Sequence, residues 1–133
     1  MMIYKLNIKE IIENYDGENE DKLYIVKKIP NDNIHYTKYL IKYKKNKLTN
    51  DNISTLGLYR SVIVFKNNNT DEYSIKCFSP PKSSNYNLFI EQNNFDDCML
   101  TEMIDGTMIN LFYDEYINEW VPCTKSNVGA NCK

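Results

Sequence analysis

The pattern that most constrains the fold lies between residues 101 and 129. A polar segment containing Asp105-Gly106 leads into an apolar run over residues 108–113, and a polar turn at 114–118 separates this run from a second one that ends in a basic, glycine-terminated segment. Two strand-forming runs joined by a short polar turn are typical of a β-hairpin. The sequence therefore predicts an antiparallel hairpin in the last third of the chain.

The register of this hairpin determines which polar groups meet at its open end. If the turn is centred near Tyr116, antiparallel pairing places Thr107 opposite Lys125. The hairpin would then hold the Asp105-Gly106 corner beside a lysine. We expect any chemistry of the chain to lie at this end.

The rest of the chain also favours antiparallel β-structure. It has 133 residues, 42% of them apolar, which is enough for one domain with its own core. Alternating apolar residues and turn-forming Asn, Asp, Gly and Pro predict an α+β fold that is rich in antiparallel strands and has short peripheral helices. The strands are expected at residues 23–29, 36–43, 58–65, 73–78, 98–104, 107–114 and 119–125, and the helices near 7–15, 49–56 and 85–92.

Charge limits the classes of partner. The formal net charge of −2 argues against a broad basic surface for non-specific nucleic-acid binding, but it allows a local cluster. One basic run follows the expected strand 36–43 and consists of Lys42, Lys44, Lys45 and Lys47. Such a run is either a solvated turn or an RNA-contacting surface.

The cysteines indicate the compartment. Cys77, Cys98, Cys123 and Cys132 are widely spaced and His35 is the one histidine, so neither a zinc site nor a redox motif is indicated. The sequence shows no secretory leader and no apolar run approaching the roughly 18 residues of a membrane span. We therefore expect a cytoplasmic protein without membrane contact and with reduced thiols.

Two motifs in the hairpin region resemble a known family. Met103-Ile104-Asp105-Gly106 and Lys125-Ser126-Asn127-Val128-Gly129 are similar to the Lys-x-Asp-Gly and Lys-Ser-x-Gly-like segments of the nucleotidyltransferase core of RNA ligases, DNA ligases and mRNA capping enzymes. The resemblance is greatest to phage-type RNA ligases and suggests a member from a large DNA virus. Upstream, Leu58–Phe65 resembles the family strand whose arginine lies near the nucleotide, and Cys77–Lys82 resembles the loop that supplies a lysine.

The resemblance implies a pocket for ATP or GTP, with Mg²⁺ and RNA ends as further partners. Its nucleotide-binding residues would be Arg60, Lys82, Asp105, Gly106 and Lys125. In the family a lysine attacks the α-phosphorus, but here Met103 occupies that position. A thioether has no proton to lose and forms no stable phosphoramidate, so covalent nucleotidylation by this route should fail and no catalytic residue is assigned. Lys82 is the one nearby substitute nucleophile.

The resemblance covers residues 58–133, which correspond to the N-terminal part of the family core, and residues 1–57 are interpreted as an elaboration of the same domain. Later family motifs, including a glutamate for metal and ribose, have no counterpart before residue 133. The chain thus looks like a truncated reading frame or a fragment. An incomplete sheet leaves open edges, so we expect association with a partner chain or a missing C-terminal segment.

Two other functions are consistent with the same residues. Besides an RNA-ligase-like nucleotidyltransferase domain that is impaired in covalent catalysis, the chain could be a non-catalytic module that holds a nucleotide or an RNA end, or an inactive fragment. Taken singly, each motif residue also has an ordinary explanation: Arg60 as a surface charge, Lys82 as a loop tip, Asp105-Gly106 as a turn and Met103 as a core filler.

Overall fold

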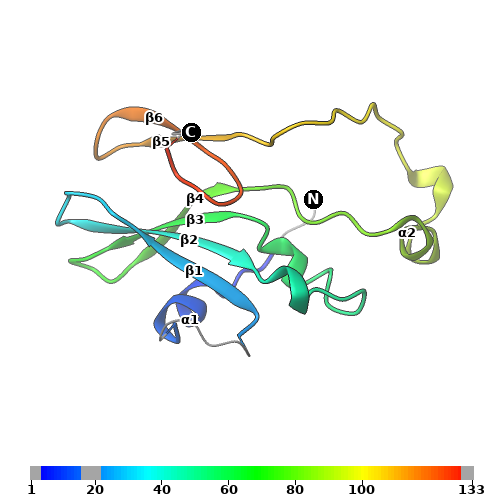
Figure 1. Cartoon of the computed structure of the whole chain (residues 1–133), viewed down its shortest axis with the longest axis horizontal. Coiled ribbons are helices and arrows are strands. Elements are labelled where there is room, and N and C mark those ends of the chain that lie inside the picture. The colour runs from blue at the N-terminus through cyan, green and yellow to red at the C-terminus, as the bar shows by residue number, and fades with distance from the viewer. Residues whose placement is uncertain (1–3, 16–21, 130–133) are drawn as a thin grey trace.

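The computed structural model describes residues 4–15 and 22–129, and a four-stranded antiparallel sheet lies at its centre (Figure 1). Every strand pairs with its neighbour along the chain, in the spatial order β1-β2-β3-β4. The strands are β1 (Tyr24–Ile29), β2 (Tyr36–Tyr43), β3 (Val62–Asn67) and β4 (Tyr73–Phe78). With the short helices described below, this confirms the predicted α+β, β-rich fold class.

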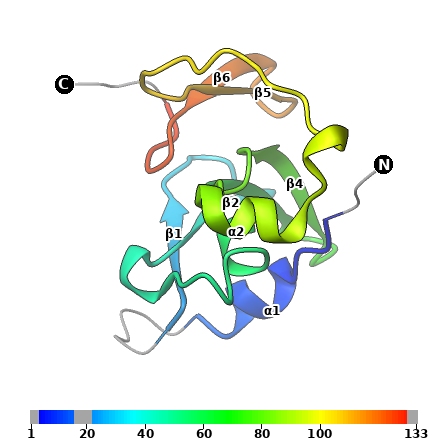
Figure 2. The ribbon, with the colours of Figure 1, turned by 90° about the vertical axis from the view of Figure 1, so that its right-hand side faces the viewer.

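Both faces of the sheet are buried, and Figure 2 shows the resulting layers. Helix α1 (Ile8–Glu13) covers one face, where Ile8 and Ile12 pack with Val62 and Val64 of β3. On the other face, residues of β2 and β3 pack against the C-terminal hairpin, and these residues are Tyr36, Leu40, Ile63, Phe65, Phe112 and Cys123. Because successive residues of a strand point to opposite faces, the predicted alternation along β3 explains why it contributes to both cores.

The C-terminal hairpin consists of β5 (Asn110–Asp114) and β6 (Glu119–Cys123). Its register pairs Asn110 with Cys123 and Asp114 with Glu119, so the predicted hairpin is present. The ladder begins only at Asn110, whose side-chain amide donates a hydrogen bond of 2.6 Å to Ser79 Oγ at the end of β4. Thr107 precedes this anchor and is not paired with Lys125, which corrects the register expected at the open end.

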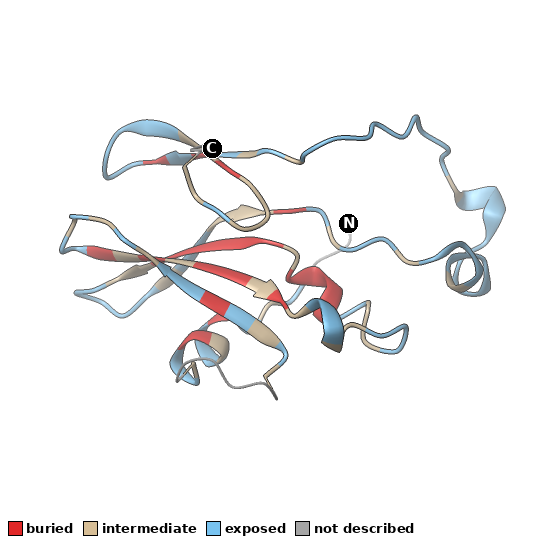
Figure 3. Cartoon of the chain, viewed as in Figure 1, coloured by how far each residue is buried: buried red, intermediate tan, exposed pale blue. Residues whose placement is uncertain are grey.

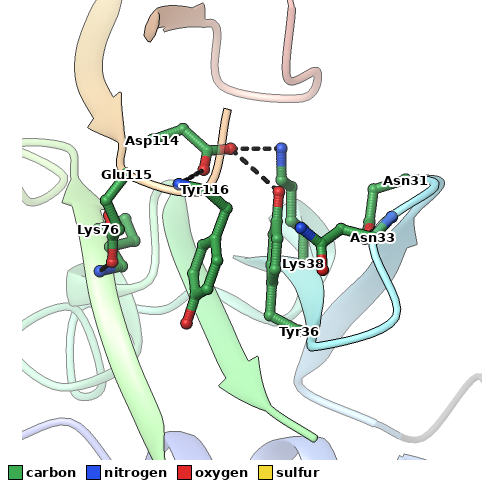
Figure 4. Close-up of polar contacts among 8 residues, drawn as sticks. All are labelled: Asn31, Asn33, Tyr36, Lys38, Lys76, Asp114, Glu115 and Tyr116. Carbon is green, nitrogen blue, oxygen red and sulfur yellow. Dashed lines mark hydrogen bonds and ion pairs between the residues drawn. The ribbon is translucent and has the colours of Figure 1, made fainter. Parts of the chain in front are cut away.

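A buried ion pair fixes the hairpin onto the sheet (Figure 4). Lys38 Nζ of β2 lies 2.6 Å from Asp114 Oδ2 of β5, and the two side chains are 9% and 0% exposed. The Tyr36 hydroxyl donates to the same carboxylate oxygen over 3.4 Å, and the Tyr116 backbone N–H donates to Asp114 Oδ1 over 3.1 Å. A second pair, between Lys76 of β4 and Glu115, lies beside it. Asp114 thus ends β5, shapes the turn and neutralises a buried lysine.

The chain between the two sheets is mostly irregular. Asn85 caps α2 (Tyr86–Gln92) by accepting a 2.9 Å hydrogen bond from the Leu88 N–H, as expected of an N-cap asparagine. The 3₁₀ helix η3 (Phe95–Asp97) follows, and residues 98–109, which we call the arm, then run in extended form along the hairpin side of the molecule (Figure 1). The predicted strand at 98–104 is therefore wrong, because none of the described strands pairs with this segment.

Two other predicted elements differ from the structure. Residues 49–56 were expected to be helical, but they form turns followed by the 3₁₀ helix η2 (Leu56–Leu58). The Asn52 side chain accepts from the Thr49 N–H over 2.8 Å and donates to the Lys47 carbonyl over 3.0 Å, which satisfies the backbone locally in place of a helix. Since η2 occupies residues 56–58, β3 starts at Val62 and not at Leu58.

Candidate functional site

The segment after β6 folds into a compact loop against the sheet. The Thr124 N–H donates to the Asn127 carbonyl over 2.8 Å, and Cys123 forms an isolated antiparallel bridge with Val128. The Gly129 N–H donates to the Pro122 carbonyl over 2.9 Å, and Gly129 has a φ of 80°, a conformation that favours glycine. This closure holds Lys125, Ser126 and Asn127 next to side chains of β1 and β2.

Three lysines meet at this loop from different elements. Lys42 Nζ of β2 donates to Ser126 Oγ over 3.0 Å, and Lys27 Nζ of β1 lies 3.4 Å from Asn127 Oδ1. Lys125 Nζ lies 5.1 Å from the centre of the Tyr43 ring, which is a cation–π distance. The loop therefore joins β1 and β2 to the C-terminal segment through cationic side chains.

Electrostatic coupling extends this group to five residues. Lys125 is repelled by Arg60 and by Lys45 of the 3₁₀ helix η1 (Lys45–Lys47), and Lys42 is repelled by Lys125 and Lys27. We call Lys27, Lys42, Lys45, Arg60 and Lys125 the basic cluster. In the part of the chain that the structure describes, none of the five forms an ion pair with an acidic side chain.

Burial and like charge both act on the two central lysines. Burial, followed by the charges of Lys125 and Lys27, lowers the pKa of Lys42 below its ordinary value. Burial, followed by the charges of Arg60 and Lys45, does the same to the pKa of Lys125. Lowered lysine pKa values mean that the positive charge is unfavourable there without an anion. An anionic group at the loop would relieve this repulsion.

An unsatisfied donor lies in the same cluster. Arg60 Nε is a buried side-chain nitrogen without a hydrogen-bond partner among the described residues. Most buried polar atoms in proteins are hydrogen-bonded, and exceptions are often associated with a functional role. A planar guanidinium beside lysines suits the oxygens of phosphate or carboxylate groups. The cluster therefore has the chemistry of an oxyanion site.

The structure brings together two of the residues that the sequence pattern singled out, Arg60 and Lys125. Lys82 lies in the loop after β4, where its backbone N–H donates to the Gly57 carbonyl over 2.9 Å and its side chain is exposed. No contact between the Lys82 side chain and the basic cluster is found within residues 4–15 and 22–129.

The other three predicted site residues lie on the arm. Met103 is 87% exposed, so it neither fills a core nor faces a pocket. Asp105 and Gly106 are exposed as well, and a Cβ added to Gly106 would meet nothing within 4 Å. In this conformation the arm holds the Met-x-Asp-Gly motif away from contacts with the rest of the described chain.

The sequence pattern missed three members of the basic cluster. Lys42 and Lys45 belong to the basic run that was recognised as either solvated or RNA-contacting, and Lys27 lies near the end of β1. Their convergence on residues 125–127 depends on the packing of the hairpin over the sheet. No local pattern carries that information, although the absence of acidic residues from the run 42–48 is a usable signal.

Several other features bear on possible ligands. A pocket of about 290 Å³ next to the cluster is lined by Lys27, Ile29, Pro30, Asn127, Val128 and Gly129. A second pocket of about 330 Å³ lies between α1 and β1, away from the predicted site residues. The described residues contain no group of three or more His, Cys, Asp or Glu side chains placed to hold a metal ion. Within the described residues, every helix is too short or too polar to cross a bilayer.

Comparison with known proteins adds no relative. No protein-family model, no curated protein and no solved structure matches this chain.

Proposed function

We propose that this protein is a non-catalytic module that binds the phosphate groups of a nucleotide or of an RNA end at the basic cluster. The observation that carries the proposal is the convergence of Lys42, Arg60 and Lys125 with no acidic partner among the described residues. Charge-assisted contacts from several cations to one phosphate are the usual basis of phosphate recognition in proteins.

The layout of the cluster supports a small, highly charged ligand. Lys42 is already held by Ser126 Oγ, and Lys125 is held over the Tyr43 ring, so both amines are positioned before a ligand arrives. Pre-positioned groups lose less side-chain entropy on binding. Ser126 Oγ and the free Arg60 Nε–H supply further hydrogen-bonding capacity. ATP, GTP and a 5′-phosphorylated RNA end all present the required oxygens.

A covalent step is not part of the proposal. The motif position for the nucleophile is Met103, which has no ionisable amine, and its side chain faces solvent. Lys82, the one substitute considered, is exposed in a loop outside the basic cluster. We propose further that the chain is related by descent to RNA-ligase-like nucleotidyltransferases, and that it has kept the phosphate site but lost the nucleophilic lysine. A cytoplasmic location and binding of ATP together with Mg²⁺ belong to the same proposal.

Titration calorimetry with ATP, and fluorescence anisotropy with a short RNA carrying either a 5′-phosphate or a 5′-hydroxyl, test the proposal. We expect Lys42→Gln and Lys125→Gln each to weaken binding roughly tenfold, which corresponds to a charge-assisted contact of about 1.5 kcal/mol. The matched control is Lys28→Gln on β1, an exposed lysine outside the cluster, and it should bind like the unmodified chain. Equal affinities for all three variants would refute the basic cluster as the site.

Two further outcomes separate the alternatives. Incubation with α-labelled ATP followed by a denaturing gel should leave no labelled band, and a band that disappears in Lys82→Ala would restore the enzymatic interpretation. Failure to bind ATP, GTP and both RNAs at low salt would leave the inactive fragment as the remaining explanation.

A further inference from the structure

The arm is a strand-forming segment that has no strand to pair with. Its apolar residues Met99, Leu100, Met103 and Ile104 are between 84% and 87% exposed (Figure 3). The sequence pattern of residues 98–104 favours a strand, yet the segment joins neither sheet. Such an extended segment, with unpaired backbone groups and exposed apolar side chains, is suited to strand addition at an open sheet edge.

The arm belongs to residues 83–124, which we call the acidic segment. From Ser83 to Thr124 there is no lysine or arginine, whereas the acidic residues of this stretch are Glu91, Asp96, Asp97, Glu102, Asp105, Asp114, Glu115 and Glu119. The first five are exposed and form no ion pair within the described residues. Within residues 4–15 and 22–129, ion pairs of this segment are formed by Asp114 with Lys38 and by Glu115 with Lys76, and both lysines belong to the central sheet. Contacts between the acidic segment and lysines of the sheet therefore already stabilise the packing within one chain.

An open edge of matching charge is present in the same molecule. Among the described residues, β1 is an end strand of the sheet and pairs with β2 on one side only. Leu23 directly before it and Ile25 within it are 43% and 37% exposed, and Lys27 and Lys28 are exposed as well. Lysine on an edge strand normally discourages pairing, but it favours pairing with an acidic strand. The β1 edge thus combines backbone groups that no other described strand pairs with, apolar side chains and positive charge.

We propose that the arm of one molecule pairs with the β1 edge of a second copy of this chain, and that the exchange is reciprocal. The arm cannot make this contact in its own chain as it is folded, because both views place it on the hairpin side of the molecule and away from β1 (Figures 1 and 2). A second copy is the partner that the observations favour, since each copy supplies one acidic arm and one basic edge. Reciprocal pairing uses both and gives a closed two-fold dimer, the commonest symmetry of soluble oligomers.

The dimer contact and the proposed phosphate site can be tested separately, by substitutions at different residues. Lys27 contacts Asn127 of the loop, and because successive residues of a strand point to opposite faces, Lys28 is expected on the other face of β1. Substitutions for this test are therefore placed at Lys28. On the arm side, Glu102 is exposed and lies between the two apolar pairs 99–100 and 103–104. Neither residue is part of the proposed binding function, and the dimer does not depend on that function.

Sedimentation equilibrium on the full chain tests the proposal by charge exchange. The unmodified chain of 15.7 kDa should sediment at twice its mass. Lys28→Glu alone and Glu102→Lys alone should each shift the dimer dissociation constant upward at least tenfold. An equimolar mixture of the two variants should restore the dimer, because both arm–edge contacts in the mixed dimer then join opposite charges. Glu91→Lys on α2, an exposed acid outside the arm, is the matched control and should not change the mass.

Three results would overturn the proposal. The first is a monomeric unmodified chain at the highest attainable concentration, and the second is a mixture of variants that stays monomeric although circular dichroism shows both to be folded. The third is a dimer in which the amides of residues 98–104 exchange with deuterium as fast as free peptide, since strand pairing must protect alternate amides.

Discussion

Replacing Asp114 with alanine should destabilise the fold severely, and the structure indicates the size of the effect. The carboxylate is fully buried, lies 2.6 Å from a lysine that is itself 9% exposed, and accepts hydrogen bonds from Tyr36 and from the Tyr116 backbone. Removing one partner of a buried ion pair leaves the other charge uncompensated, which costs about 3–5 kcal/mol. A domain of this size has a total stability of roughly 5–15 kcal/mol. Asp114→Ala should therefore remove about a fifth or more of it.

Urea unfolding followed by far-UV circular dichroism measures this effect. With an m-value of roughly 2 kcal/mol/M, the midpoint of Asp114→Ala should fall by about 2 M. Asp71→Asn is the matched control, because it removes the charge from the Lys66–Asp71 pair of 2.8 Å at a side chain that is 73% exposed, and because asparagine tolerates the φ of 57° at this position. Its midpoint should hardly move. The double variant Lys38→Met/Asp114→Leu should recover part of the loss, because it buries no charge but leaves the Tyr36 hydroxyl and the Tyr116 N–H without this acceptor. Similar midpoints for Asp114→Ala and Asp71→Asn would refute this account of the hairpin contact.

Two predictions concern pH. Burial raises the pKa of Cys123 from 9.0 to about 12, so between these values the unfolded chain releases a proton that the folded chain keeps, and stability should fall with rising pH by up to about 1.4 kcal/mol per unit. Melting temperatures from pH 8 to 11 should therefore fall more steeply for the unmodified chain than for Cys123→Ala, and parallel curves would contradict the assignment. The pKa values of Lys42 and Lys125 lie below the ordinary 10.5, so as the pH rises both amines lose their charge earlier than an ordinary lysine does. This loss of charge reduces the affinity for phosphate. Calorimetry at pH 8–10 should show this loss, and Lys42→Arg/Lys125→Arg, which keeps its charge, should bind ATP with little pH dependence.

Local sequence signals were sufficient for most of the central sheet. The alternation in β3 and the Asn-rich turn after it predict a hairpin to β4, and the predicted bounds of β2 and β4 match the structure. The arm shows the limit of such signals, because strand propensity at residues 98–104 produces a strand only where an edge is available to pair with it. The Lys38–Asp114 pair could not be predicted either, because no residue near Lys38 in the sequence indicates that a carboxylate of the hairpin will pack against it.

The candidate site was only partly predictable for the same reason. The motif comparison singled out Arg60 and Lys125, and the structure brings these two together through the loop that closes after Cys123. Lys42 was noted only as part of a basic run, although its contact with Ser126 places it next to Lys125. The motif order along the chain also holds for Lys82, Asp105 and Gly106. Their positions in space, however, depend on the course of the loop after β4 and of the arm, which the motifs do not determine.

Nuclear magnetic resonance of the lysine side chains tests the central claim most directly. The ε-methylene signals of Lys42 and Lys125, assigned through Lys→Arg variants, report the protonation of each amine during a pH titration. We predict that both titrate below the ordinary lysine pKa of 10.5 in the free protein and that saturating ATP raises both pKa values, because a bound phosphate stabilises the charged amines. The signals of Lys28 should not move when ATP is added. If Lys42 and Lys125 titrate identically with and without ATP, the basic cluster does not bind phosphate and the proposed function is wrong.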